Sequence, residues 1–309
     1  MEDTTQHSVA RASQDSAALA AAMPRLVLEA RRIASSVQHG LHGRRRVGTG
    51  ENFWQYRRFA DGEPAARVDW RRSARDDHLY VREREWEAAH TVWIWPNLSP
   101  SMDYASPRLP PKRERALVLA FALADLLVKG GERVGMPNLM RPSANRRIVE
   151  RMAEAVLHAP EHPALPPAFN PSPLSELVLL GDFWSPTEAV TTRIRTLAGT
   201  GAHGHVVQVV DPAEETFPFS GRVEFHGPDE AISLTVGRAE TWRADYETRL
   251  AAHRAAIRAA AEGMGWAFAV HRTDRPASEI LLTLHSRMGS GEILNPAAAK
   301  TDSPRTPAP

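Results

Sequence analysis

The sequence contains no cysteine, which excludes disulfide bonds, thiolate catalysis and cysteine-ligated zinc. It also lacks a strong net charge. The formal value is +1 at pH 7, so no global field draws the chain to nucleic acid or to an anionic membrane. No apolar run reaches the roughly 18 residues that span a bilayer, and the polar start MEDTTQHSVARASQDS has no apolar segment of the signal-peptide type. We therefore expect a cytoplasmic protein that binds no nucleic acid and does not insert into a membrane.

The common catalytic and nucleotide-binding motifs are missing as well. There is no G-x-x-x-x-G-K-[ST] and no G-x-G-x-x-G after a strand, so the sequence does not indicate an ATPase or a dinucleotide-dependent enzyme. A G-x-S-x-G elbow and an H-E-x-x-H motif are also absent. His203 and His205 lie two apart in GAHGH, but the sequence places no carboxylate beside them. We interpret them as solvated loop histidines rather than as metal ligands.

From His90 onward the sequence alternates segments typical of strands with segments typical of helices. Strands are predicted at TVWIW, RVGMPNLM, SELVLLGDF, HGHVVQVVDP and WAFAVHRT, and helices are predicted between and after them. The segments GRVEFHG and AISLTVG flank PDE and predict a β-hairpin. This alternation predicts an α/β fold in which a mainly parallel sheet carries crossover helices on both faces.

The two ends of the chain differ from this central part. The polar residues 1–15 and the tail NPAAAKTDSPRTPAP are too poor in large apolar residues to bury a core, and we predict that both are disordered. A helix is predicted from about Pro24 to Ser36, because proline is tolerated in a first turn. The predicted division is a disordered tail at 1–15, an N-terminal segment at 16–87 that docks on the core, an α/β domain at 88–288, and a disordered tail at 289–309.

Polar side chains follow three of the predicted strands. Asn97, Ser99 and Ser101 follow TVWIW, Asp182 follows SELVLLG, and Asp211 follows HGHVVQVV. Ligands of open parallel sheets bind at the carboxyl ends of the strands, and hydroxyls with a carboxylate suit a hard ion such as Mg²⁺. From spacing alone, the preferred interpretation is instead that Asp182 and Ser101 cap the helices that follow. A different class of function, a metal-dependent phosphoesterase or nuclease using Asp182 and Asp211, is the alternative, although Asn97 lacks the carboxylate that would support it.

The segment from Arg44 to Glu87 is crowded with charge. It holds eleven arginines and nine acidic residues, a net charge of only +2, so its pattern is not the lopsided one of a nucleic-acid patch. We predict a short helix that starts near Asp69, followed by a strand at HLYVRERE. Paired charges and aromatic rings here form either a network that docks the segment onto the core, which is the preferred interpretation, or a protein-binding face.

This segment and the strand after it resemble the domain-of-unknown-function-58 family. The family pattern runs G-x-G-x-E-F, R-x-Y, a PGD-type turn, R-x-I-D-W-x-x-S/A-A-R, L-x-V-R, and a strand that ends in D-x-S-x-S-M. RVGM, LLGDF and VVDPAEETFPFSG resemble further family segments, and the likeness covers about residues 40–285. The matching residues of the first block are Gly48, Gly50, Arg57, Arg67, Asp69, Trp70, Ser73, Ala74, Arg75, Leu79, Val81 and Arg82.

The resemblance implies a von Willebrand factor A-like domain, a doubly wound sheet with helices on both faces, preceded by an arginine- and tryptophan-rich helical and β segment. Such domains bind protein partners through a metal-ion-dependent adhesion site. Family members are linked with MoxR-type AAA+ ATPases and are thought to act as adaptors, not enzymes, in chaperone-like assembly or metal insertion. Asp182 and the serines of the loop at 97–101 would be the metal-site residues.

This sequence departs from the family pattern at the metal-site loop. The first position is Asn97 instead of aspartate, which removes a ligand charge, and Pro100 stiffens the loop and removes an N–H. The segment AFNPSPLSE offers no threonine to complete the site. We therefore expect a degenerate site formed by Asn97, Ser99, Ser101 and Asp182, with no tightly held metal and at most weak binding of Mg²⁺.

Overall fold

Two units of the chain pack separately in the computed structural model, which describes residues 2–42, 55–60, 64, 68–75, 78–83, 90–160, 162–227 and 233–289. One unit combines Met1–Gln38 with Thr91–Pro309, and the other is His39–His90. The predicted N-terminal segment 16–87 is thus divided between them, because its helical part belongs with the sheet. Residues 290–309 of the predicted C-terminal tail lie outside the described residues.

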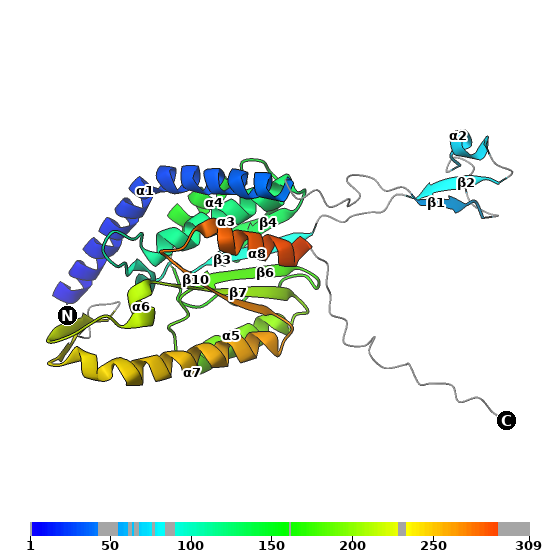
Figure 1. The fold of residues 1–309 in the computed structure, drawn as a ribbon. Coiled ribbons are helices and arrows are strands. Elements are labelled where there is room, and N and C mark those ends of the chain that lie inside the picture. Colours follow the sequence, from blue (N-terminus) through cyan, green and yellow to red (C-terminus); the bar gives the residue numbers. More distant parts are fainter. Residues whose placement is uncertain are drawn as a thin grey trace, which may run out of the picture. The chain divides into compact units, whose positions relative to one another are not determined.

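A six-stranded sheet in the order β10-β7-β6-β3-β4-β5 forms the centre of the first unit (Figure 1). All neighbouring strands are parallel except β4 and β5, which pair antiparallel. The prediction of one strand at RVGMPNLM is wrong, because Pro137 and Asn138 turn the chain there. Asn138 has a φ of 59°, a conformation that asparagine tolerates in turns. The strands are β3 (Thr91–Pro96), β4 (Arg133–Met136), β5 (Met140–Ser143), β6 (Glu176–Gly181), β7 (His203–Val210) and β10 (Ala267–Arg272).

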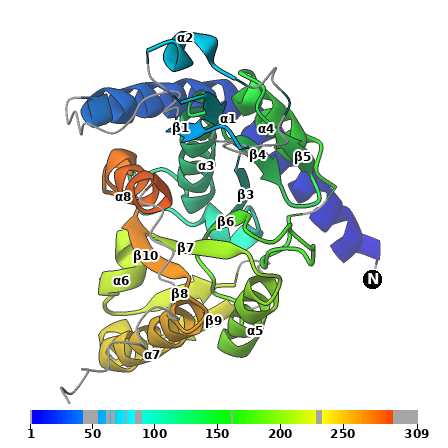
Figure 2. The same ribbon diagram turned by 90° about the vertical axis from the view of Figure 1, so that its right-hand side faces the viewer.

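Helices cover both faces of this sheet, as Figure 2 shows, and the predicted α/β architecture is confirmed. One face carries α3 (Lys112–Lys129), α4 (Ile148–Leu157) and α8 (Ala277–Gly289), and the other carries α5 (Thr187–Ala198) and α7 (Arg243–Glu262). Helix α3 is buried around its whole circumference from Ala116 to Val128, the pattern of a helix enclosed by neighbours. No helix in the described ranges is long and apolar enough to cross a membrane.

Helix α1 (Glu2–His42) is longer than predicted. Residues 2–15 belong to it, so the predicted disordered tail and the predicted start at Pro24 are both wrong. Apolar residues on either side of Pro24 share one buried stripe, which holds the helix together across the missing N–H, and an established helix extends at little further cost. Figure 1 shows that α1 is bent, as expected for a helix with an internal proline. The stripe is Leu19, Met23, Leu26, Ala30, Ala34 and Val37.

Ion pairs tie α1 to the helices beneath it. The guanidinium of Arg25 lies 2.6 Å from the carboxylate of Glu114 in α3, and Arg31 pairs with Glu150 in α4. Both pairs are partly exposed, so each adds little to stability. They fix the register of α1 on the sheet unit, while its apolar stripe supplies the burial.

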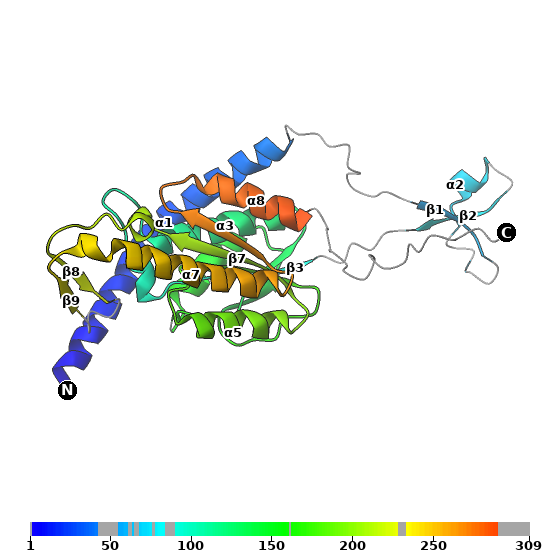
Figure 3. The same ribbon diagram turned by 60° about the horizontal axis from the view of Figure 1, so that its bottom comes forward.

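An insertion follows β7 at the carboxyl end of the sheet. It consists of the short helix α6 (Pro212–Thr216), the strands β8 (Val223–His226) and β9 (Ser233–Val236), and the 3-10 helix η3 (Ala239–Trp242). The two strands pair antiparallel, so the predicted hairpin is confirmed. Figure 3 shows them as a two-stranded ribbon beyond the start of α7.

The second unit contains the antiparallel strands β1 (Gln55–Arg58) and β2 (Tyr80–Glu83) and the one-turn helix α2 (Trp70–Ser73). The predicted helix start is confirmed, because the carboxylate of Asp69 accepts the N–H of Arg72 at 3.0 Å as an N-cap. The buried hydroxyl of Ser73 donates to the Asp69 carbonyl and accepts the N–H of Tyr80. The D-W-x-x-S block therefore builds a local turn that joins α2 to β2.

Candidate functional site

The carboxyl ends of β3, β6 and β7 meet at one edge of the sheet, because these three strands are parallel neighbours. Asn97, Asp182 and Asp211 each follow one of them directly, and all three are buried. Asn97 and Asp182 approach closely because residue 181 is glycine. A Cβ atom at Gly181 would lie only 2.8 Å from the Cβ of Asn97. Of the residues expected in the degenerate site, Asn97 and Asp182 are in direct contact, and whether these residues form a binding site stays a prediction.

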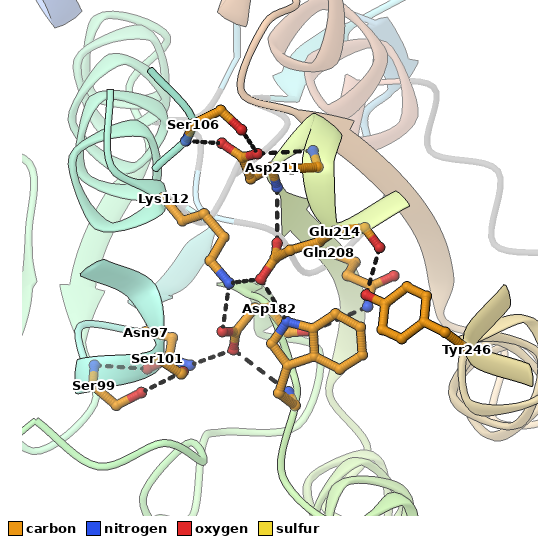
Figure 4. A network of polar contacts seen from close by, with 12 residues as sticks. Asn97, Ser99, Ser101, Ser106, Lys112, Asp182, Gln208, Asp211, Glu214 and Tyr246 are labelled. Atoms are coloured by element: carbon orange, nitrogen blue, oxygen red, sulfur yellow. Dashed lines mark hydrogen bonds and ion pairs between the residues drawn. The ribbon is translucent and has the colours of Figure 1, made fainter. Parts of the chain in front are cut away.

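The Asn97 side chain uses both ends of its amide (Figure 4). Its Nδ2 donates to Oδ1 of Asp182 at 3.2 Å, and its Oδ1 accepts the N–H of Ser99 at 2.9 Å. An ionised aspartate at this position could not donate to Asp182 and would place a second negative charge beside it. The amide therefore suits an arrangement in which Asp182 is satisfied by donors from the protein itself.

The ammonium group of Lys112 lies at the centre of the site. Its Nζ is 3.0 Å from Oδ2 of Asp182 and 2.5 Å from Oε1 of Glu214, and its side chain is completely buried. Lys112 is the first residue of α3, which begins at the carboxyl edge of the sheet, so its side chain points to the strand ends. The protein thus supplies its own cation between two carboxylates.

The donor set does not fit a divalent ion. Both oxygens of Asp182 already accept hydrogen bonds, one from Asn97 and the other from Lys112. The hydroxyls of Ser99 and Ser101 lie 3.2 Å apart and bond to one another. An ion held by Asp182 would lie beside the Lys112 ammonium, and like charges at such range repel. Across the described residues, no group of three or more His, Asp or Glu side chains is placed to hold a metal.

Asp182 does not cap the helix that follows β6, and Ser101 does not cap the one that follows β3. The N-cap of α5 is Pro186, and Ser101 lies inside the 3-10 helix η2 (Pro100–Asp103), whose N-cap Ser99 makes no side-chain cap bond. The preferred capping interpretation is therefore wrong for these two residues. It fails because α5 begins only at Thr187 while Asp182 bonds to the distant Lys112, and because the Ser101 hydroxyl bonds to that of its neighbour Ser99.

Asp211 is the residue that caps a helix. Its carboxylate accepts the N–H of Ala213 at 2.9 Å and the N–H of Ser106 at 2.8 Å, and it also bonds to the Ser106 hydroxyl. Glu214 completes a capping box by accepting the N–H of Asp211 at 2.9 Å. Asp211 and Asp182 therefore have separate structural partners, and the geometry does not assemble the two-carboxylate centre of the phosphoesterase alternative.

Further polar groups surround the network. Gln208 donates to the carbonyl of Asp182 at 3.0 Å and accepts from Arg254 at 2.8 Å. The indole of Trp184 donates to Glu214 at 3.0 Å. Nearly every polar atom of the site is thus engaged by the chain, as buried polar networks require.

The pKa values of two tyrosines at this edge of the sheet are raised. Burial, followed by the charge of Glu214, raises the pKa of Tyr246 to about 12. Burial also raises the pKa of Tyr104, and the carboxylates of Asp211 and Glu214 add to this increase. The hydroxyl of Tyr246 donates to the backbone carbonyl of Glu214 at 2.5 Å. Burial is thus the first cause of both raised pKa values, and the nearby carboxylates add to it.

The histidines of GAHGH do not lie in a loop. Both belong to β7, and the buried His205 has its Nε2 at 3.5 Å from a carboxylate oxygen of Glu176 on β6. The prediction that they are solvated and have no carboxylate neighbour is wrong for His205. Parallel pairing of β6 with β7 creates this contact, which sequence spacing does not reveal.

The remaining family-motif residues lie in the second unit. Trp70 is 62% exposed, Arg75 is exposed, and Ser73 is buried. The backbones of Arg57 and Arg82 lie in β1 and β2, opposite Val81 and Tyr56 respectively. Arg67 and the side chains of Arg57 and Arg82 lie outside the described residues. How this unit contacts the sheet unit stays a prediction.

Sequence reasoning missed Lys112, Glu214, Gln208 and Trp184. Glu214 carried a readable signal, since D-P-A-E is an Asp-x-x-Glu capping box directly after a strand. No such sequence signal marks Lys112, because the sequence shows only a lysine at the start of a predicted helix. Its partners Asp182 and Glu214 are 70 and 102 residues away.

Comparisons with known proteins place the chain in a family. An uncharacterized protein of Mycobacterium tuberculosis is 26% identical over 292 residues, which cover 87% of this chain and 89% of the relative. The crystal structure of conserved hypothetical protein BatB from Bacteroides thetaiotaomicron is similar over 65% of this chain and 100% of that chain, with 15% identity and a TM-score of 0.42. An uncharacterized membrane spanning protein from Vibrio fischeri is similar over 64% of this chain and 98% of that chain, with 13% identity and a TM-score of 0.20. The profile of the family described as "Protein of unknown function DUF58" matches residues 55–256, so the chain belongs to the DUF58 family.

Proposed function

We propose that this chain is a non-enzymatic adaptor that binds a protein partner, without a bound metal ion, at the carboxyl edge of its sheet. The observation that carries the proposal is the buried Lys112 ammonium, which lies between Asp182 and Glu214. In a metal-dependent adhesion site a divalent cation would balance carboxylates at such an edge. Here a covalently attached cation does so, and the site needs no ion to be stable.

The domain type that we propose is von Willebrand factor A-like. A mainly parallel sheet with helices on both faces supports this type, as does the polar loop that follows β3. The side chains that would ligate the ion in such a domain are here bonded to one another or to Lys112. The proposed mode of partner binding is therefore direct contact rather than coordination through a metal.

The enzymatic alternative has less support. A phosphoesterase or nuclease would need carboxylates free to hold an ion and activate water. The carboxylate of Asp211 is buried and serves as a helix cap, and Asp182 is neutralised by Lys112. Asn97 supplies no further charge. We therefore propose no catalytic residue for this chain.

The proposed partner is a MoxR-type AAA+ ATPase, and the proposed process is chaperone-like assembly or metal insertion in the cytoplasm. The chain belongs to the DUF58 family, and the link between members of this family and MoxR-type ATPases supports this partner class. The balanced arginine and acid content of residues 44–87 favours protein contacts over nucleic acid.

Co-purification tests the partner. The tagged chain is expressed together with the MoxR-type ATPase of the same cell and purified in ATP and Mg²⁺. We expect a stable complex, and failure to recover it would remove the support for this partner. A screen of phosphoester substrates with Mg²⁺ and Mn²⁺ tests the enzymatic alternative, and turnover that is lost in Asp182→Ala would establish it.

Calorimetric titration tests the metal-free site. Mg²⁺ and Mn²⁺ are titrated into the purified chain in the absence of nucleotide. We expect no heat of specific binding. Submillimolar binding that disappears in Ser99→Ala would overturn the proposal that the site works without an ion.

A further inference from the structure

An open groove lined by aromatic rings lies beside the polar network at the carboxyl edge. Its volume is about 660 Å³, and it also contacts Ser101 and Glu214 of the site. Its rim is exposed, since Tyr104 is 40% and Trp242 is 43% accessible to solvent. Exposed apolar surface gathered in one concave place marks an interaction site more often than scattered single residues do. The principal rings are Tyr104, Trp184, Phe217, Phe225, Trp242 and Tyr246.

The floor of the groove is built by rings that hold one another in place. The ring centroid of Phe217 lies 4.8 Å from that of Tyr246 and 5.9 Å from that of Phe225. Phe217 has a φ of 41°, a left-handed conformation that is unfavourable for an aromatic residue. Its N–H bonds to the carbonyl of Ala213 and ends α6 in this strained geometry. The groove is therefore formed in advance by strained backbone and ring packing.

The charge beneath the groove is negative. The network holds the carboxylates of Asp182, Asp211 and Glu214 against the one ammonium of Lys112. Burial raises the pKa values of Tyr104 and Tyr246, two rings of the groove, and the charge of Glu214 adds to the increase in both. Two arginines lie nearby: Arg254 pairs with Glu215 at 2.8 Å, and Arg243 donates to the neutral Phe217 carbonyl and keeps its charge. With these included, four acidic groups (Asp182, Asp211, Glu214 and Glu215) face three basic ones (Lys112, Arg243 and Arg254), which leaves an excess of one negative charge.

We infer that this groove binds a partner protein by taking up an arginine side chain flanked by apolar residues. Aromatic faces attract a guanidinium, and the attraction is stronger where water is displaced. Arginine also stacks on rings and keeps its charge at every physiological pH. The negative field of the network favours a cation and disfavours an acidic side chain. The volume of the groove exceeds that of a single side chain, so neighbouring apolar residues fill the rest.

The inference rests on the proposed function in one respect: both take the ligand to be a segment of a protein. It reverses the usual chemistry of an adhesion site, where a bound cation captures an acidic residue. Here the internal cation Lys112 is completely buried and already shared by Asp182 and Glu214, so an incoming acid has no open charge to meet. The preferred partner residue is accordingly basic.

Peptide binding to the full-length chain tests the inference. Short fluorescent peptides share the same apolar flanks and carry Arg, Lys, Gln, Leu or Glu at the centre, and binding is followed by anisotropy. We expect the Arg peptide to bind most tightly and the Lys peptide next, with the other three at least about tenfold weaker. Equal or tighter binding of the Leu or Glu peptide, or no binding of any peptide up to about 1 mM, would overturn the inference.

Variants of the groove separate a cation site from a plain apolar one. Trp242→Leu keeps an apolar side chain but removes the ring, and we expect about tenfold weaker binding of the Arg peptide. Met264→Ala is the matched control, because Met264 is equally exposed at 42% and follows the far end of α7. Unchanged affinity in Trp242→Leu, or equal loss in the control, would contradict the inference.

The two proposals fail separately. Loss of the complex with the ATPase while the Arg peptide still binds would reject the ATPase as partner and keep the arginine groove. A complex that forms and is unaffected by Trp242→Leu, without binding of the Arg peptide, would reject the groove and keep the adaptor.

Discussion

The polar network and the aromatic groove share one edge of the sheet but differ in where their chemical groups are satisfied. In the network, Lys112, Asp182 and Asn97 find their hydrogen-bond partners within the protein and are shielded from water. In the groove, Tyr104 and Trp242 present large exposed surfaces to solvent. The difference separates stability from recognition: changes in the network should destabilise the fold, while changes at the exposed rim of the groove should mainly alter what it binds.

The largest effect is expected for Lys112→Met. The change leaves Asp182 and Glu214 buried without their shared cation, and breaking a buried pair from one side costs about 3–5 kcal/mol. Urea unfolding measures the loss. Arg249→Met is the control, because Arg249 pairs with Asp245 at 3.4 Å and both side chains are exposed, at 82% and 77%. The control should lose less than about 0.5 kcal/mol. Similar losses in the two variants would show that the network is not the stabilising region.

Asn97→Asp should have the next largest effect. The new carboxylate cannot donate to Asp182 and adds like charge beside it, so we expect a loss of about 1–3 kcal/mol. Thermal unfolding with and without Mg²⁺ measures it. We expect no rescue by Mg²⁺, because Lys112 keeps its place between the carboxylates. A rise in the melting temperature with Mg²⁺ in this variant alone would show that the site still accepts an ion.

Tyr246→Phe tests the boundary between the two regions. Tyr246 lines the groove and donates to the Glu214 carbonyl, so its loss should cost about 1 kcal/mol at neutral pH. Ultraviolet titration should also lose the tyrosine that ionises near pH 12. Because its pKa is raised by folding, Tyr246 supports the fold below pH 10 and this support disappears as the pH approaches 12. An unchanged titration curve would place the hydroxyl in water instead.

The smallest effect on stability is expected for Trp242→Leu in the groove. Its side chain is substantially exposed, and exposed substitutions usually change the free energy of unfolding by less than about 0.5 kcal/mol. The same variant should weaken arginine-peptide binding as described above. A loss of several kcal/mol on urea unfolding would mean that Trp242 belongs to the core, and the contrast between the two regions would fail.

Much of the fold could be predicted because its signals are local. Apolar strands and helix periodicity act over a few residues, and the structure confirms the strands of the sheet and the pairing of β8 with β9. The predicted helix start at Pro24 failed for a tertiary reason. Leu19 and Met23 pack on the same buried stripe as the residues after Pro24, so the helix continues across the proline.

The candidate site was predictable only in part. The strand-end positions of Asn97, Asp182 and Asp211 follow from the alternation of strands and helices. Their partners do not, since Asp182 meets Lys112 from a distant helix and Asp211 meets Ser106 from a distant loop. The assignment of caps failed at Asp182 because a buried ammonium is a stronger partner than a backbone N–H.

The sequence by itself determined the strands, the helices and which polar residues stand at the strand ends, because these depend on local periodicity and chain order. It also determined that position 97 carries an amide. The tertiary structure alone decided that Lys112 lies where an ion would otherwise be needed, and that rings following η2, β6 and α6 join rings of β8, η3 and α7 in one groove beside it. The physical reason is that charge balance and burial arise between residues far apart in the chain, whose proximity exists only once the sheet is assembled.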